Sequence, residues 1–149
     1  MNVIISGGGT GGHIYPAVAI AQKIQENIND VNILYVGIKG GPEEAIAKKY
    51  GYKFEPIEGM GMPRKINRRL FKSLSKNMRG FKAARKIINE FKPDIAIGTG
   101  GYVCGPIIYQ AAKLKVPTII HESNSYPGKT SKYLSKKVDY VCISYAEAI

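Results

Sequence analysis

The sequence predicts an α/β domain built on a doubly wound, Rossmann-like parallel sheet, and three observations support this fold class. Apolar, β-branched segments alternate with segments of helical periodicity along the chain, as expected for a parallel sheet with crossover helices. Two of the strand-to-helix junctions, residues 6–13 and 98–105, are rich in glycine. The 149 residues are enough for one domain with a complete hydrophobic core.

The individual elements follow from the same periodicity. Strands are expected at residues 2–5, 31–36, 53–57, 94–97, 116–120 and 138–143, and helices at 14–21, 43–50, 66–91, 107–114 and 129–134. Pro16 should lie in the first turn of its helix, and Pro56 should place its strand at a sheet edge. Glu43 and Glu44 begin a helix, where the helix dipole favours acidic residues. Gly80 should kink or break the long helix.

The first glycine-rich junction, residues 6–13, reads Ser-Gly-Gly-Gly-Thr-Gly-Gly-His. A strand, a glycine loop and a helix start form an anion site, because glycine lets the backbone approach a ligand and the free N–H groups point at it. Gly7, Gly9 and Gly12 also fit the dinucleotide pattern G-x-G-x-x-G, but no acidic residue ends the second strand to bind a ribose. A P-loop would have lysine where this chain has His13. The remaining interpretation is a diphosphate-sugar site.

The second junction and the turn after the fifth strand should join the first junction in one cleft. In the strand order 3-2-1-4-5-6, strands one and four are neighbours, and ligands bind beyond their carboxyl ends. Residues 98–105 and the turn 121–124 (His-Glu-Ser-Asn) would both lie there. His13 is a candidate general base or, equally, a phosphate ligand. Glu122 is a second candidate base or an orienting residue, and Asn124 suits a sugar hydroxyl.

Charge is concentrated in one segment of a chain whose net charge is +11. Residues 64–92 hold eleven lysines or arginines and one acid. In the first half of that segment, basic residues flank an apolar ridge, which suits an anionic membrane surface. The ridge is Ile66, Leu70, Leu74, Met78 and Phe81, and the flanking residues are Arg64, Lys65, Arg68, Arg69, Lys72, Lys76 and Arg79. Nucleic acid is the rival partner, but the chain contains no recognised nucleic-acid-binding motif.

Cysteine content and hydropathy indicate the compartment. Cys104 and Cys142 are too few for a disulfide framework, which favours a reducing, cytoplasmic environment. No apolar run is long enough to span a bilayer, and no signal peptide is visible. The sequence has no zinc-type spacing and no D-x-D motif. We therefore expect no metal and no cofactor.

Four segments together resemble the MurG family of peptidoglycan N-acetylglucosaminyltransferases over essentially the whole chain. They are residues 8–17, 92–94, 100–106 and 121–124. The resemblance implies one half of a two-domain GT-B glycosyltransferase that moves GlcNAc from UDP-GlcNAc to the C4 hydroxyl of MurNAc in lipid I (undecaprenyl-diphosphate-MurNAc-pentapeptide). It also implies inversion, no obligatory metal, a role in cell-wall synthesis, cell shape and cell division, and a peripheral location on the cytoplasmic face of the bacterial plasma membrane.

The resemblance further implies roles for individual residues. The residues expected to contact the sugar donor, UDP-GlcNAc, are Thr10, Gly11, Gly12 and Asn124. Those expected to contact the acceptor or its diphosphate are Gly9, His13, Gly100, Gly101, Tyr102 and His121. Catalytic roles fall to His13 and Glu122. The membrane surface comprises Arg68, Arg69, Leu70, Phe71, Lys72, Leu74, Met78 and Phe81. Ser123 departs from the family, which more often has glutamine at that position.

The family's second domain, which holds most of the uridine and diphosphate contacts, is absent from this chain. Residues 1–149 would therefore be an N-terminal, acceptor-binding domain that is inactive without a C-terminal, donor-binding domain. One alternative is a non-catalytic, membrane-anchoring half of a two-chain glycosyltransferase, although such halves usually carry a membrane-spanning N-terminus that this chain lacks. The other alternative is a dinucleotide-binding module.

Overall fold

The computed structural model describes residues 1–61 and 68–148, and its centre is a six-stranded, all-parallel sheet. The strands are β1 (Asn2–Ser6), β2 (Asn32–Ile38), β3 (Lys53–Ile57), β4 (Ile95–Gly98), β5 (Thr118–Glu122) and β6 (Tyr140–Ile143). Their order, β3-β2-β1-β4-β5-β6, confirms the predicted one. Ser6 is level with Gly98 on the neighbouring strand. The two glycine-rich junctions therefore leave the sheet side by side.

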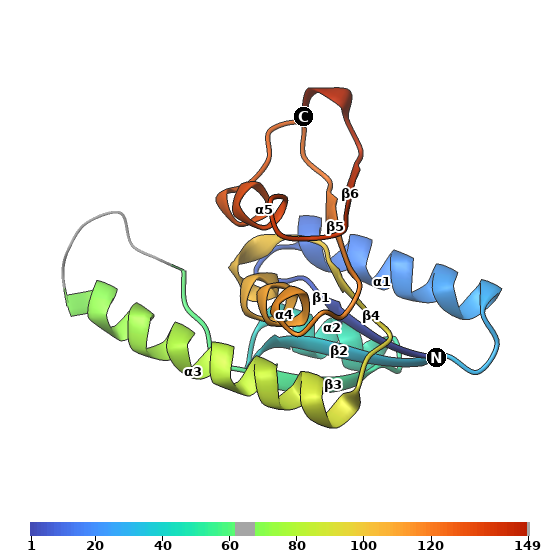
Figure 1. Cartoon of the computed structure of the whole chain (residues 1–149), viewed down its shortest axis with the longest axis horizontal. Helices are drawn as coiled ribbons and strands as arrows, with labels where there is room; N and C mark the ends of the chain where they lie inside the picture. Colours follow the sequence, from blue (N-terminus) through green and yellow to red (C-terminus); the bar gives the residue numbers. More distant parts are fainter. Residues whose placement is uncertain (62–67, 149) are drawn as a thin grey trace.

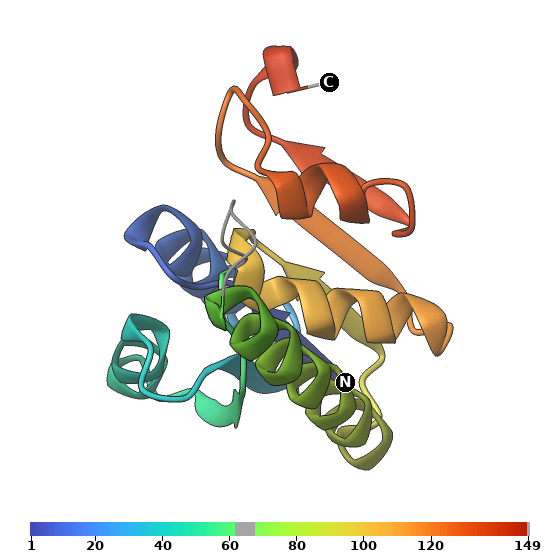
Figure 2. The same cartoon turned by 90° about the vertical axis from the view of Figure 1, so that its left-hand side faces the viewer.

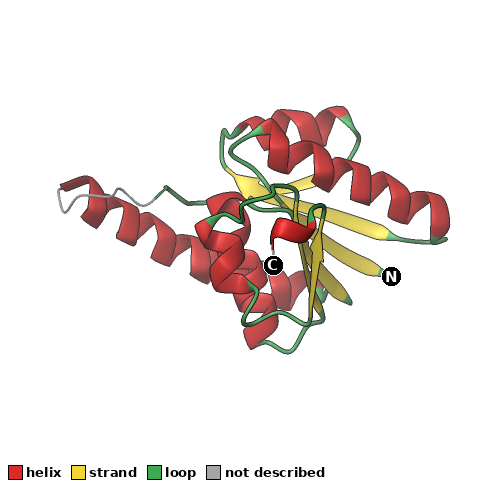
Figure 3. Ribbon diagram, turned by 90° about the horizontal axis from the view of Figure 1, so that it is seen from above, coloured by secondary structure: helices red, strands yellow, loops and turns green. Residues whose placement is uncertain are grey.

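Helices cover both faces of the sheet (Figures 1 and 3). They are α1 (Gly11–Asn27), α2 (Pro42–Lys49), α3 (Arg68–Phe91), α4 (Gly101–Lys113) and α5 (Lys129–Leu134), followed by a 3-10 turn, η1 (Ala146–Ala148). Successive strand residues point to opposite faces. Accordingly, Val3 and Ile5 pack in the core beneath α1 and α2, whereas Ile4 packs in the core beneath α3 and α4. Figure 2 shows α3 lying alongside α4 on that second face.

The position of Pro16 differs from the prediction. Helix α1 already begins at Gly11, so Pro16 lies in the second turn rather than the first. Proline lacks an N–H, and the carbonyl four residues earlier, that of Gly12, therefore has no helical donor. The hydroxyl of Ser123 donates to this carbonyl oxygen instead, at 3.1 Å. Pro16 thus leaves the Gly12 carbonyl oxygen free to accept a hydrogen bond from the turn that follows β5.

Two further sequence predictions about helices were wrong. Gly80 does not break α3, which runs unbroken from Arg68 to Phe91. Instead, a Cβ at Gly80 would collide with the carbonyl oxygen of Glu58, so glycine is needed for close packing. Helix α4 begins at Gly101 rather than at residue 107. Gly105 and Pro106 lie in the second turn of this helix. Pro106, like Pro16 in α1, leaves the carbonyl four residues earlier, that of Tyr102, without a helical donor.

Helix α3 has two halves with different environments. Ala84 and Ile88, in its C-terminal half, are buried against the sheet. Its N-terminal half projects past the carboxyl edge of the sheet (Figure 1), at the end of the molecule where the glycine-rich junctions lie. No helix within residues 1–61 and 68–148 has the length and apolar character needed to cross a bilayer.

Candidate functional site

The two glycine-rich junctions and the turn after β5 are joined by direct hydrogen bonds. The Thr99 N–H donates to the Ser6 carbonyl oxygen at 2.9 Å, and the Thr99 hydroxyl donates to the His13 carbonyl oxygen at 2.6 Å. The Ser123 hydroxyl adds the link to Gly12. Three segments far apart in the sequence therefore form one surface at the carboxyl edge, where open α/β sheets bind their ligands.

The first glycine loop is also held from below by β2 and α2. The buried hydroxyl of Tyr35 donates to the Gly7 carbonyl oxygen at 2.6 Å, and the carboxylate of Glu43 accepts the Gly9 N–H at 3.2 Å. Burial, followed by the nearby Glu43, raises the pKa of Tyr35, so its hydroxyl stays a donor. Sequence reasoning missed both residues. It placed Tyr35 in a strand and explained Glu43 by the helix dipole alone.

The hydrogen bond between Gly9 and Glu43 limits which N–H groups of the first glycine loop are free to bind a ligand. The N–H of Gly9, a predicted diphosphate contact, is already bonded to Glu43. In the described part of the chain, the N–H groups of Thr10, Gly11 and Gly12 have no hydrogen-bond partner. These groups open α1, where the helix dipole favours an anion. Residues 10–12 therefore carry the N–H groups of the loop that remain free to contact an anion.

The ring of His13 lies against the backbone of the second junction. A Cβ at Gly100 would lie 2.8 Å from His13 Nδ1, and one at Gly101 would lie 3.2 Å from His13 Cδ2. Nδ1 is buried and has no hydrogen-bond partner among the described residues. Nε2 is therefore the ring nitrogen left for a substrate. Geometry thus leaves His13 able to act as a base or as a hydrogen-bonding ligand.

Tyr102 borders the same loop on the other side. Its ring is partly exposed, and a Cβ at Gly9 would lie 3.5 Å from it. Burial and, to a smaller extent, Glu43 raise the pKa of Tyr102. The phenol is consequently neutral at physiological pH and can donate a hydrogen bond to a ligand.

Glu122 is a buried carboxylate already occupied by the turn that follows it. It accepts the Asn124 N–H at 3.0 Å and the Asn124 side-chain amide at 2.7 Å, and also the Gly128 N–H at 3.2 Å. Burial alone would raise the pKa of Glu122, but hydrogen bonds from Ser131, Asn124 and Gly128 outweigh it and lower the pKa. These contacts suit a residue that orients Asn124 better than one that removes a proton.

His121 makes a different contact from the one its position in the turn suggested. It belongs to β5, and its Nε2 lies 3.2 Å from the Ser144 hydroxyl. No hydrogen bond within residues 1–61 and 68–148 connects it to either glycine-rich junction. Its Nδ1 is buried without a partner in the same part of the chain.

Where the structure describes it, the predicted membrane surface is exposed except at Phe81, which is half-buried. Phe71, Leu74 and Met78 are exposed apolar side chains, with exposed fractions of 68%, 42% and 64%. Arg68 and Lys72 are exposed beside them. Arg64, Lys65 and Ile66 lie outside the described residues, as do the side chains of Arg69 and Leu70. Among the described residues, Arg68, Lys72 and Lys76 form no ion pair.

The apolar surface continues from α3 onto α4 and α5. Phe81 meets the ring of Tyr109 edge-on at 5.5 Å, and Tyr109 stacks on Tyr133 at 6.3 Å. Lys137 lies over both tyrosine rings, at 5.7 and 5.3 Å. Together with Met78, these rings line a shallow hollow of about 460 Å³. Sequence periodicity missed this extension, because Tyr109 and Tyr133 belong to other helices.

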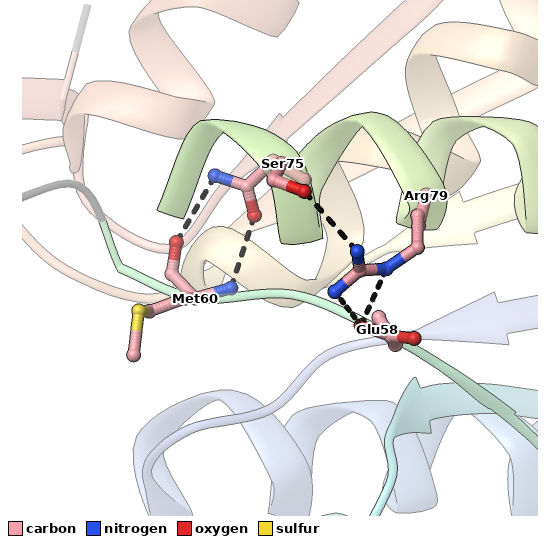
Figure 4. A network of polar contacts seen from close by, with 5 residues as sticks. Glu58, Met60, Ser75 and Arg79 are labelled. Atoms are coloured by element: carbon pink, nitrogen blue, oxygen red, sulfur yellow. Dashed lines mark hydrogen bonds and ion pairs between the residues drawn. The ribbon is translucent and has the colours of Figure 1, made fainter. Parts of the chain in front are cut away.

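A polar network holds α3 against the loop that follows β3 (Figure 4). Arg79 donates to Glu58 from Nε at 3.0 Å and from a terminal nitrogen at 2.8 Å. The Met60 N–H donates to the Asn77 side chain at 3.0 Å, and that side chain donates back to the Met60 carbonyl oxygen at 3.1 Å. Arg79, one of the basic residues flanking the ridge, is therefore already engaged within the protein.

The fold and site define a class of protein, namely a Rossmann-like domain that presents two glycine-rich junctions at the switch point of its sheet. Residues 3–143 match the glycosyltransferase family 28 N-terminal domain, and the chain belongs to that family. Because the match covers the site and all but the ends of the chain, it confirms the resemblance noted in the sequence.

Similar proteins agree with this assignment. Proteins from Halalkalibacterium halodurans and Finegoldia magna are 48% and 49% identical over 99% and 100% of the chain. Both are named UDP-N-acetylglucosamine--N-acetylmuramyl-(pentapeptide) pyrophosphoryl-undecaprenol N-acetylglucosamine transferase. The crystal structure of Acinetobacter baumannii MurG matches 99% of the chain with a TM-score of 0.82 and 28% identity. The chain spans 41%, 40% and 42% of these three proteins.

Proposed function

We propose that the chain is the acceptor-binding, N-terminal half of an inverting glycosyltransferase that moves GlcNAc from UDP-GlcNAc to the C4 hydroxyl of MurNAc in lipid I. The observation that carries this proposal is the convergence of the two glycine-rich junctions and the Asn124 turn on one edge of the sheet. Relatives that are 48% and 49% identical to this chain are named for these substrates, which supports the choice. A C-terminal half would supply most of the contacts to UDP-GlcNAc.

The chemistry assigned to the site uses few side chains. The resemblance assigns residues 10–12 to the donor and Gly9 to the acceptor diphosphate. Because the Gly9 N–H is already bonded to Glu43, we instead assign the diphosphate of the acceptor to the free N–H groups at residues 10–12. His13 Nε2 takes the proton from the attacking C4 hydroxyl, the C4 oxygen bonds to C1 of GlcNAc, and UDP leaves from the opposite face. Asn124, held by Glu122, hydrogen-bonds a sugar hydroxyl. The backbone of Gly100 and Gly101 packs against the His13 ring, and Tyr102 borders the loop at Gly9.

Binding measurements separate this proposal from the dinucleotide alternative. Isothermal titration of the chain with a water-soluble lipid I analogue carrying a short prenyl chain should give saturable binding, and NAD should give none. His13→Ala should weaken binding of the analogue by about tenfold, the loss of one good hydrogen bond. Binding of NAD without binding of the analogue would instead favour a dinucleotide-binding module. GlcNAc transfer by this chain alone should be undetectable, and measurable transfer would contradict the division into two halves.

The second part of the proposal is that the surface formed by Phe71, Leu74, Met78 and Phe81, with its basic neighbours, rests on the cytoplasmic face of the plasma membrane. Each basic side chain near an anionic surface contributes about 1 kcal/mol, so Arg68, Lys72 and Lys76 together would give reversible attachment. Helix α3 starts at the carboxyl edge of the sheet. A membrane-embedded prenyl tail would therefore lie on the same side of the protein as the glycine-rich junctions.

Vesicle sedimentation tests the membrane contact. The chain should sediment with phosphatidylglycerol-containing vesicles at low salt, less at high salt, and more strongly when the vesicles contain lipid I. The double variant Phe71→Ser/Met78→Ser should stay in solution. Tyr50→Ser, which changes an exposed aromatic residue at the end of α2, should sediment like the wild type. Equal sedimentation of both variants would place the contact elsewhere.

A further inference from the structure

Glu43 is a fully buried carboxylate that the proposed chemistry does not use. It lies in the first turn of α2 with an exposed fraction of 0%. One carboxylate oxygen accepts the Ile38 N–H at 2.9 Å, and the other accepts the Gly9 N–H at 3.2 Å. A buried charged group is costly unless its hydrogen-bonding capacity is met. The carboxylate therefore connects the end of β2 to the glycine loop after β1.

Three glycines from separate segments make room for this carboxylate. A Cβ at Gly8 would lie 2.5 Å from Glu43 Cδ, one at Gly37 would lie 2.5 Å from its Cγ, and one at Gly41 would lie 2.7 Å from its Oε1. Real side chains do not approach this closely, so each glycine keeps the space that Glu43 fills. Gly8 is thus explained by a neighbour inside the protein rather than by a ligand above the loop.

The bond to Gly9 acts at the point where the loop changes direction. Gly9 has a φ of +83°, and the next residue, Thr10, is extended, without a side-chain hydrogen bond that caps α1. Glu43 therefore takes part in fixing the peptide that immediately precedes the free N–H groups of residues 10–12. Since the carboxylate is fully buried beneath the loop, it makes no contact with a ligand above the loop and can affect binding only through the backbone or through the field of its charge.

We propose that Glu43 is a positioning residue that sets the conformation of the glycine loop and so aims its free N–H groups at the acceptor. This inference rests on the proposed function of the loop as an acceptor site. The inference predicts the direction in which ligand affinity changes when the charge of Glu43 is removed. If the loop were merely an electrostatic trap for anions, a buried negative charge below it would oppose binding, and its removal would strengthen binding. If Glu43 positions the loop, its removal weakens binding.

The test compares Glu43→Gln with Glu44→Gln in the 149-residue chain. Glu44 is the adjacent acid on α2, where it pairs with Lys48 at 2.7 Å and accepts the Gly40 N–H. Glutamine has one acceptor oxygen, so it can keep only one of the two bonds. We expect it to keep the shorter one, to the Ile38 N–H at 2.9 Å, which turns its amide group toward the Gly9 N–H. We expect the Gly9 amide to exchange with deuterated solvent about tenfold faster in Glu43→Gln, as loss of a charged hydrogen bond predicts, and to be unchanged in Glu44→Gln.

Affinity for the soluble lipid I analogue supplies the second readout. Glu43→Gln should weaken binding about tenfold. A merely structural Glu43 would lower stability and leave the affinity of the folded chain unchanged. Unaltered Gly9 exchange, or equal or tighter binding, would overturn the inference. If the wild type does not bind the analogue, the proposed function fails, while Gly9 exchange still decides the role of Glu43. Glu43→Asp, which keeps the charge but shortens the reach, should show the same faster exchange and serves if the glutamine variant does not fold.

Discussion

Gly101→Ala perturbs the contact between the two glycine-rich junctions, and its cost can be worked from the structure. Gly101 has a φ of +78°, and an L-residue in that left-handed region costs about 1 kcal/mol. A Cβ there would also collide with the Gly8 carbonyl oxygen and press on the His13 ring. Moving the Gly8 carbonyl and the His13 ring apart to make room for this Cβ costs about 2 kcal/mol more. The expected loss in the free energy of unfolding is therefore about 3 kcal/mol.

Gly51→Ala is a matched control for the backbone part of this cost. Gly51 has nearly the same φ, +80°, but nothing lies within 4 Å of its potential Cβ. This variant should lose only about 1 kcal/mol. Urea denaturation followed by circular dichroism measures both changes, with equal m-values showing that the unfolded states are comparable. If Gly101→Ala costs no more than Gly51→Ala, the two junctions do not pack as described.

Other substitutions probe the supports of the site. Tyr35→Phe removes the hydroxyl bonded to Gly7 and should lower the free energy of unfolding by about 1.5 kcal/mol in urea titrations. Tyr52→Phe, which removes a hydroxyl bonded to a side chain, should cost less. Glu122→Gln should cost about 2 kcal/mol at pH 7. Because the pKa of Glu122 is lowered below 4.5 in the fold, its contribution is present above that pH and is lost as the pH falls through the folded value. Urea titrations at pH 7 and pH 3 should therefore show the difference shrinking, and a difference independent of pH would contradict this assignment. Ser123→Ala, at an exposed hydrogen bond, should cost less than about 1 kcal/mol.

Local pattern was sufficient to predict most of the fold. Val3 and Ile5 face one core and Ile4 faces the other, and such apolar runs are typical of parallel strands buried on both faces. Alternation of strands and helices then left few topologies, of which the observed strand order is a common one. The convergence of the glycine-rich junctions follows directly from that order.

Contacts between distant segments could not be predicted in the same way. Glu43 and Gly9 are 34 residues apart, and the dipole argument that explained an acid at a helix start gave no reason to bury it. Its residue type suggests that Gly80 breaks the helix. In the structure, glycine is required there because the Glu58 carbonyl, from the loop after β3, leaves no room for a Cβ. Helix α4 was predicted to start too late because Gly105 and Pro106 are poor helix formers, yet both lie in its second turn.

Mapping of the ligand onto the backbone tests the central claim most directly. The ¹⁵N-labelled chain is titrated with the soluble lipid I analogue, and amide chemical shifts are followed by NMR. We predict that the shifted amides cluster at residues 9–13, 100–102 and 123–124 and move together with one dissociation constant. Shifts confined to one of these segments, or located on α2 and β3, would contradict a single acceptor site formed by both glycine-rich junctions.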